Sequence, residues 1–128
     1  MSEIKEEIGV SQEVTEKLCL LQPRCVVCGS TFGLQIHHRI FRSEVAIMAA
    51  FVRCMIALYK KSYGRDLEPW GLHDIQNLVR LCNNCHEGGS GRGVHGGNET
   101  LRQAMRFSFT CPQTGFIIPF FKPPNRLF

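Results

Sequence analysis

Cys25-Val26-Val27-Cys28 and Leu81-Cys82-Asn83-Asn84-Cys85-His86 are the two stretches of this sequence that decide the fold. Each stretch contains a Cys-x-x-Cys pair, and two such pairs can close one tetrahedral zinc site with four thiolate ligands. Because the energy of binding a structural zinc becomes folding energy, the site would stabilise a small domain. The predicted zinc ligands are Cys25, Cys28, Cys82 and Cys85.

Three histidines accompany this predicted zinc site although the zinc does not need them. His37 and His38 are adjacent in the run Ile36-His37-His38-Arg39, and His86 directly follows the second cysteine pair. Neighbouring residues of an extended segment point to opposite sides, so His37 and His38 can serve different tasks. Imidazole binds metals and also titrates near neutral pH, where it can act as a base. The histidines therefore predict a second, chemically active site beside the zinc.

The composition is that of one globular domain kept in a reducing compartment. The chain has 128 residues, and its hydrophobic share of 44% and charged share of 20% are ordinary for a globular protein. No apolar run is long enough to span a membrane, and residues 1–7 lack the pattern of a signal peptide, so we expect a cytoplasmic protein without a membrane partner. An odd number of cysteines, 7, with paired spacing favours metal binding over disulfides. The remaining cysteines are expected to be small buried residues: Cys19, Cys54 and Cys111.

The charges are distributed unevenly along the chain. The net charge is +4, but the first sixteen positions are rich in acid and no acidic residue follows Glu99. Between Arg39 and Arg65 several bases face only Glu44. A basic body with an acidic head suits a polyanionic partner such as nucleic acid. A solvated surface with a chance bias explains the same charges equally well.

Periodicity and capping residues predict an α+β fold. The long helix is apolar over a wide face, so it is buried against its own domain or against a second copy, and the C-terminal tail covers the core or a partner subunit. A homodimer through the 43–61 helix or the tail is the corresponding partner hypothesis. The predicted helices are 11–22, 43–61, one beginning near 83–87, and 98–106; the extended segments are 32–38, 78–81 and the tail 116–121, and 87–97 is a glycine-rich loop.

The order and spacing of these residues resemble the HNH nuclease motif in its zinc-stapled form. The resemblance covers roughly 25–86 and includes Ile36-His37-His38-Arg39 and the run from Asn77 to His86. It implies a ββα-metal core, in which two short antiparallel strands and a helix grip one divalent cation. We therefore expect residues 1–128 to form a single nuclease domain with a motif core at 25–95, a helical insertion at 43–62, flanking helices and a strand-like tail.

The resemblance also implies a role for each matching residue. His38 would be the general base, His37 and His86 would bind the catalytic cation, and Asn77 would hold the loop carrying His38 by hydrogen bonds. The implied reaction is hydrolysis of DNA phosphodiester bonds, leaving 5′-phosphate and 3′-hydroxyl ends. Arg39 or Arg42 would contact the phosphate, although an ordinary surface role suits either arginine as well.

Two departures from the family pattern concern the catalytic metal. Many members carry Asp at the position of His37, and imidazole ligands favour Mn²⁺, Ni²⁺, Co²⁺ or Zn²⁺, while Mg²⁺ can complete its shell with water and phosphate oxygens. Members often have a further His where this chain has Ser90, and His95 is the alternative ligand if it is not a plain loop histidine. His73 is expected to be structural. The competing function is a non-catalytic four-cysteine zinc module that binds nucleic acid or a protein partner.

Overall fold

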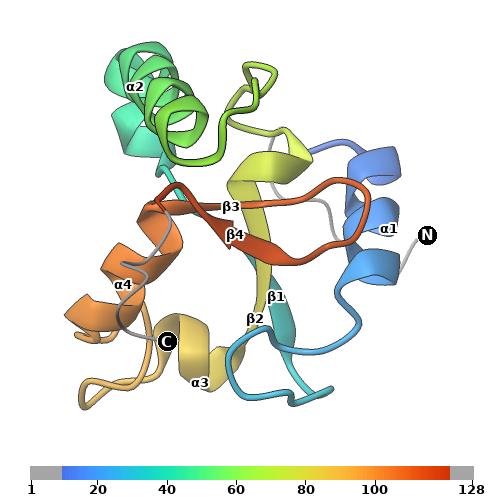
Figure 1. Cartoon of the computed structure of the whole chain (residues 1–128). Coiled ribbons are helices and arrows are strands. Elements are labelled where there is room, and N and C mark those ends of the chain that lie inside the picture. Colours follow the sequence, from blue (N-terminus) through green and yellow to red (C-terminus); the bar gives the residue numbers. More distant parts are fainter. Residues whose placement is uncertain (1–9, 122–128) are drawn as a thin grey trace, which may run out of the picture.

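The computed structural model describes residues 10–121, which form an α+β domain with four α-helices and two separate two-stranded antiparallel sheets (Figure 1). The acidic residues Glu3, Glu6 and Glu7 and the basic residues Lys122 and Arg126 lie outside this range. None of the helices in the described range is long and apolar enough to cross a membrane. In chain order the elements are α1 (Gln12–Leu21), β1 (Leu34–His38), α2 (Val45–Tyr63), β2 (Leu78–Cys82), α3 (Asn83–Glu87), α4 (Glu99–Arg106), β3 (Ser108–Thr110) and β4 (Ile117–Pro119), with 3₁₀ turns at Arg42–Glu44 and Ile75–Asn77.

The helix ends follow from local capping groups. The Ser11 hydroxyl accepts a hydrogen bond from the Val14 N–H at 3.1 Å, and the Asn98 side chain accepts one from the Leu101 N–H at 2.9 Å. Both contacts satisfy donors that the first turn of a helix leaves without a partner. Gly64 ends α2 in the left-handed conformation, with φ of 71°, which a residue without a Cβ adopts at little cost. The predicted positions of these helices are confirmed to within two residues.

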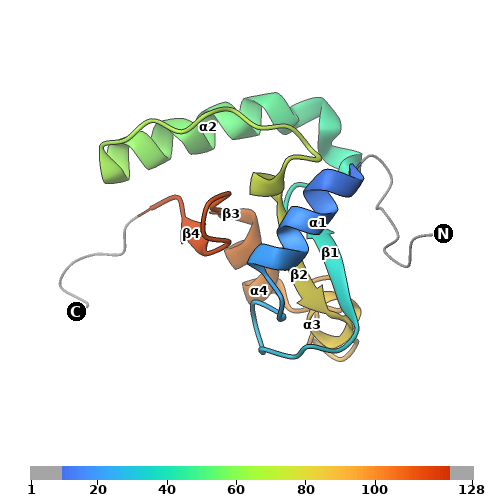
Figure 2. The same cartoon turned by 90° about the vertical axis from the view of Figure 1, so that its right-hand side faces the viewer.

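Strands β1 and β2 form the central hairpin, and α3 follows β2 without a gap. Leu34 pairs with Cys82 at one end of the hairpin, and His38 pairs with Leu78 at the other. Because β2 ends at Cys82 and α3 begins at Asn83, the two strands and the helix form one strand–strand–helix unit (Figure 2). The unit brings one end of β1 close to the second cysteine pair, and α3 contacts both strands.

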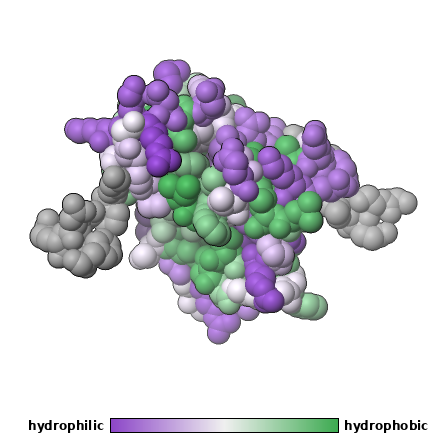
Figure 3. Space-filling view, turned by 45° about the vertical axis from the view of Figure 1, so that its right-hand side comes forward, coloured by the Kyte–Doolittle hydropathy of each residue, from purple (hydrophilic) through white to green (hydrophobic). Residues whose placement is uncertain are grey.

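Helix α2 is inserted between β1 and β2 and lies across the C-terminal hairpin (Figure 2). One of its faces is buried against aromatic residues from the hairpin of β3 and β4 and from the loop that follows α2, so the helix covers its own domain. Val45 and Ile47 of α2 are exposed, and on the face of the molecule seen in Figure 3 hydrophobic residues lie mainly in the middle, with hydrophilic residues around them. The packed residues of this cluster are Ile40, Met48, Val52, Met55, Tyr59, Trp70, Phe109 and Phe120.

Only one strand of the C-terminal hairpin, which consists of β3 and β4, was predicted from the sequence. The tail forms β4 as expected, and Phe120 directly after it is 1% exposed, so the tail covers the core of its own chain. Its partner β3 was not predicted, because three residues directly after a helix are too short to show a period. The three cysteines outside the pairs also differ from expectation. All seven cysteines are free, but Cys54 is exposed and Cys19 and Cys111 are only half-buried.

Candidate metal centre

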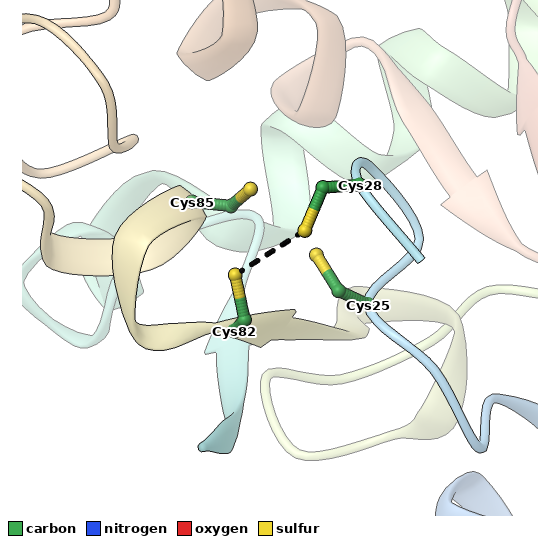
Figure 4. Close-up of side chains that lie close together, drawn as sticks. All are labelled: Cys25, Cys28, Cys82 and Cys85. Atoms are coloured by element: carbon green, nitrogen blue, oxygen red, sulfur yellow. Dashed lines mark hydrogen bonds between the residues drawn. The ribbon is translucent and has the colours of Figure 1, made fainter. Parts of the chain in front are cut away.

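The four predicted zinc ligands come together at one end of the hairpin. Their sulfur atoms all lie within 4.8 Å of one another, and Cys28 Sγ is 3.5 Å from Cys82 Sγ (Figure 4). Two sulfurs bound to one tetrahedral zinc at about 2.3 Å would lie roughly 3.8 Å apart. The geometry of the cluster therefore fits a four-cysteine zinc site.

Two segments of the backbone present these sulfurs. Cys25 and Cys28 lie on the loop between α1 and β1, where the Gly29 N–H donates to the Cys25 carbonyl at 2.9 Å. Gly29 has φ of 79°, so this tight turn needs a glycine. The Val26 N–H donates to the Arg80 carbonyl at 3.2 Å and so attaches the loop to β2. All four side chains point into the space between the loop and the strand–helix junction (Figure 4).

The thiols of this cluster do not ionise equally. Burial raises the pKa of Cys25, but the backbone N–H groups around it, those of Cys28 and Cys82 included, lower the pKa to about 7 overall. Burial, and then the neighbouring thiols, raise the pKa of Cys85 far above its ordinary value. One thiolate forms readily and the next ones are opposed by its charge, so four thiolates require a cation among them.

Three histidines form a second cluster close to the first. Ring nitrogens of His37 from β1, His86 from α3 and His95 from the following loop lie within 4.8 Å of one another. His37 is 2% exposed, and burial, followed by the neighbouring His86 and His95, lowers its pKa to about 2. A neutral imidazole is the form that binds a metal ion. Of the two alternatives for His95, the structure supports its place among the possible metal ligands.

A hydrogen bond to Gln35 orients the ring of His86 within this cluster. His86 Nδ1 lies 2.6 Å from Gln35 Oε1, and since that oxygen can only accept, Nδ1 carries the hydrogen. The remaining nitrogen, Nε2, is then the one available to a cation. The ring of Phe41 lies 5.8 Å from that of His37 and 5.2 Å from that of His95, so an apolar side chain covers part of the cluster.

The glycine-rich loop, residues 87–97, folds back so that His95 lies against α3. The His95 N–H donates to the His86 carbonyl at 2.8 Å, and the Val94 N–H donates to the Cys85 carbonyl at 2.9 Å. A Cβ at Gly96 would overlap the Gly88 carbonyl oxygen, so only glycine permits the chain to fold this closely. The glycines around His95 are a sequence signal that could have indicated this contact.

His38 and Asn77 lie at the opposite end of the hairpin from the cysteines. Asn77 is 1% exposed, and its Oδ1 accepts from the Ile40 N–H at 3.0 Å. Its Nδ2 donates to the carbonyls of Ile40 at 3.2 Å and Leu72 at 2.9 Å. The hydrogen bonds expected of Asn77 are present, and they fix the chain two residues after His38. His38 Nε2 lies 3.3 Å from Nδ1 of His73, a contact that was not predicted from the sequence.

Arg39 does not lie where the phosphate hypothesis requires, and that expectation is corrected. The side chain is 3% exposed and donates to the Met105 carbonyl at 2.9 Å and to the hydroxyls of Ser108 and Thr110, each at 2.6 Å. Burial lowers the pKa of Arg39 to about 9, so the buried side chain still carries its charge at neutral pH. Arg39 connects β1 to β3, the strand that was not predicted. The side chain of Arg42 is outside what the structure describes, and its phosphate contact stays a prediction.

No protein-family model matches this sequence, and no curated protein and no solved structure matches the chain. The cysteine cluster fits zinc, and the histidine cluster can hold a metal ion.

Proposed function

We propose that this protein is a metal-dependent endonuclease of the HNH type that hydrolyses DNA phosphodiester bonds, leaving 5′-phosphate and 3′-hydroxyl ends. The observation that carries the proposal is the cluster of His37 and His86, on the strand–strand–helix unit, with His95 from the loop after α3; His38 is adjacent to His37 in sequence. A zinc ion in the four-cysteine site would hold the loop before β1 to the junction of β2 and α3, as in the zinc-containing form of the motif. A plain zinc module has no need of a second, three-histidine cluster.

His37, His86 and His95 would hold the divalent cation. Three protein ligands leave coordination positions for substrate, as in catalytic metal sites generally. A set of three imidazoles favours Mn²⁺, Ni²⁺, Co²⁺ or Zn²⁺ over Mg²⁺. When bound, the cation would offset the negative charge of the scissile phosphate and of the leaving oxygen.

His38 is the general base in this proposal. A neutral imidazole of His38 takes a proton from water, and the water oxygen forms a bond to phosphorus as the bond from phosphorus to the 3′ oxygen breaks. The 3′ oxygen takes a proton from solvent, and the phosphate remains on the 5′ end. Asn77 keeps the chain beyond His38 in place through its bonds to Ile40, so the base does not drift from the cation site.

DNA as the substrate is consistent with the exposed basic residues of the described range. Arg92 is exposed in the loop between His86 and His95, and it replaces Arg39 as the candidate for a phosphate contact near the reacting centre. Arg106 is less suited to this role because Glu44 pairs with it at 2.7 Å. Other exposed bases lie on or just after α2: Arg53, Lys60, Lys61 and Arg65.

Relaxation of supercoiled plasmid by the purified protein tests the proposal. The protein is assayed with Mg²⁺, Mn²⁺, Ni²⁺ or EDTA, beside His38→Ala and His37→Ala variants whose zinc content and circular dichroism match the wild type. The expected result is metal-dependent nicking that both variants lose, with nicks that DNA ligase reseals directly because the ends are 5′-phosphate and 3′-hydroxyl. A folded, zinc-loaded protein that shifts DNA on a gel but cleaves none with any metal would refute the nuclease and favour the non-catalytic zinc module.

A further inference from the structure

We propose that the open groove beside the four-cysteine cluster binds an unpaired nucleotide of the DNA substrate, with the base stacked on the ring of Phe32 and a phosphate at Arg92. The inference rests on the proposed function for the kind of polymer, and it adds the DNA structure that the metal centre would receive. That structure is a strand with an unpaired base close to the scissile phosphate.

The groove borders both the cysteine cluster and the histidine cluster. It has a volume of about 820 Å³ and lies between the loop before β1 and the start of α3, with three of the four cysteines in its wall. This volume is far more than one metal ion occupies, and it falls in the range of about 300–1,000 Å³ that is common for small-molecule sites. Gln35 also lines the groove, and its Oε1 lies 2.6 Å from Nδ1 of His86. A nucleotide in the groove is therefore one side chain away from the candidate metal centre.

Phe32 presents an aromatic face at this groove. Its side chain is 87% exposed, more than any other large hydrophobic side chain in residues 10–121. The backbone that carries it is held in place, because the Phe32 N–H donates to Ser30 Oγ at 3.1 Å and the Cys25 N–H donates to the Ser30 carbonyl at 2.8 Å. A single exposed apolar residue is ordinary by itself. An exposed ring on a fixed turn, at the edge of a groove, suits stacking by a base.

The polar groups of the groove match the other parts of a nucleotide. Asn83 and Asn84 present exposed side-chain amides at the start of α3, and an amide carries both donors and acceptors, as the edge of an unstacked base requires. Arg92 is exposed and is the only charged residue among the described residues that line the groove. Four thiolates around one Zn²⁺ would leave a net negative charge, which disfavours phosphate next to the sulfurs and favours a neutral base there.

The exposed ring favours an unpaired base over a paired one. In a duplex each base is stacked between its neighbours, so its face reaches a protein ring only after the base leaves the stack. A base in a gap, a flap or a single strand presents its face at a much lower cost. An apolar side chain of a protein partner would also cover Phe32, but it would leave the amides and Arg92 without a role.

Fluorescence anisotropy with three labelled DNA probes tests this groove. The probes are a fully paired duplex, the same duplex with a short single-stranded gap, and the same gap built from abasic nucleotides. The zinc-loaded protein carries His38→Ala so that the proposed chemistry does not cut the probes, and the salt concentration is fixed because phosphate contacts depend on it. Phe32→Ala and Phe32→Trp are compared with Phe116→Ala, a matched control because Phe116 is 71% exposed and does not line the groove. Zinc content and circular dichroism must match among the variants.

The gapped duplex should bind more tightly than the fully paired duplex. Phe32→Ala should weaken binding of the gapped duplex by roughly fivefold to a hundredfold, the range for one base stacked on an aromatic ring, and should change the other two probes by less than about twofold. Phe32→Trp should retain the preference for the gapped duplex, because indole also stacks on a base. Phe116→Ala should bind all three probes like its parent.

Equal affinity for the paired and the gapped duplex would overturn the inference, as would a Phe32→Ala loss that is the same for all three probes or the same as that of Phe116→Ala. Sedimentation velocity adds a further check: if Phe32→Ala changes the oligomeric state but not the DNA affinity, the ring is a contact between protein chains and the inference fails. The proposed function is judged separately, by cleavage with the wild-type protein. If the wild type cuts no DNA while the preference that depends on Phe32 persists, the nuclease fails and the nucleotide groove stands.

Discussion

Replacing Asn77 by alanine should cost this protein about 2–3 kcal/mol of unfolding free energy, a large loss for one side chain. The residue is 1% exposed and makes three hydrogen bonds of 2.9–3.2 Å, two of them to the backbone of Ile40, which is 2% exposed. A typical hydrogen bond contributes about 0.5–1.5 kcal/mol, and a buried group left without a partner costs about 1–3 kcal/mol. The Leu72 carbonyl belongs to a half-buried residue, where water can replace the lost donor, so its share of the loss is the smallest.

Replacing Asn77 by aspartate tests the donor group of the side-chain amide separately from its acceptor oxygen. Asn77→Asp retains an oxygen that can accept from the Ile40 N–H, but it places a second oxygen against the carbonyls of Ile40 and Leu72. It also buries a negative charge, which is costly without a cation beside it. We therefore expect Asn77→Asp to lose at least as much stability as Asn77→Ala, although its shape hardly changes.

The free energy of unfolding of both variants is measured by urea unfolding followed by circular dichroism. Zinc is kept at the same excess throughout, because bound zinc itself contributes to stability. Asn84→Ala is the matched control: Asn84 is exposed on α3, so its loss should stay within about 0.5 kcal/mol. A loss under 1 kcal/mol for Asn77→Ala, or an Asn77→Asp variant as stable as the wild type, would show that the hydrogen bonds of Asn77 to Ile40 and Leu72 do not hold these two loops together.

Three further predictions concern the metal clusters and pH. Replacing Cys85 by serine, or removing zinc with a chelator, should abolish cooperative unfolding, because structural zinc contributes about 10–16 kcal/mol, at or above the whole stability of a typical domain; a folded zinc-free protein in NMR spectra would contradict this. His95→Ala should weaken Co²⁺ or Ni²⁺ binding at the histidine cluster by at least about tenfold in calorimetry with the zinc site filled, and an unchanged affinity would remove His95 from the ligand set. Burial lowers the folded-state pKa of His37 from 6.5 to about 2, so on acidification the unfolded chain takes up the proton first. The free energy of unfolding is therefore unaffected by this residue above pH 6.5, and it falls by about 1.4 kcal/mol per pH unit below that pH. The difference in stability between wild type and His37→Asn should therefore shrink on acidification, and a constant difference from pH 7 to 5 would exclude this source.

The parts of the fold that could be predicted are those whose cause is local. Ser11, Asn98 and Gly64 mark helix ends because their side chains or backbone satisfy groups within a few residues. Alternation of apolar residues and a short apolar run similarly located the two strands of the central hairpin. Strand β3 was missed because its identity depends on pairing with β4 and not on its own three residues.

The candidate site shows the same division between local and distant causes. The cysteine pairs were predicted because the Cys-x-x-Cys spacing within each pair is a local signal, whereas the hydrogen bonds of Asn77 were expected from the resemblance to the nuclease motif. The prediction that Arg39 contacts phosphate was wrong because its hydrogen-bond partners on β3 lie far along the chain. Its neighbour His38 is a candidate site residue, and this made Arg39 look like one as well. The contact of His73 with His38 was not predicted for a related reason, since the two residues meet only after a long helical insertion has folded back.

The cysteine cluster and the histidine cluster are coupled by the shortness of α3. This helix has five residues, and an isolated helix of that length is not stable in water. Cys85 and His86 are adjacent within it, so one residue faces the thiol cluster and the next faces the histidine cluster. The Val94 and His95 N–H groups in turn donate to the carbonyls of Cys85 and His86, so the loop ligand follows the helix. Zinc bound to the cysteines would therefore fix two of the three histidines, and the four-cysteine site acts on the proposed chemistry by setting the positions of His86 and His95, although its ligands take no part in it.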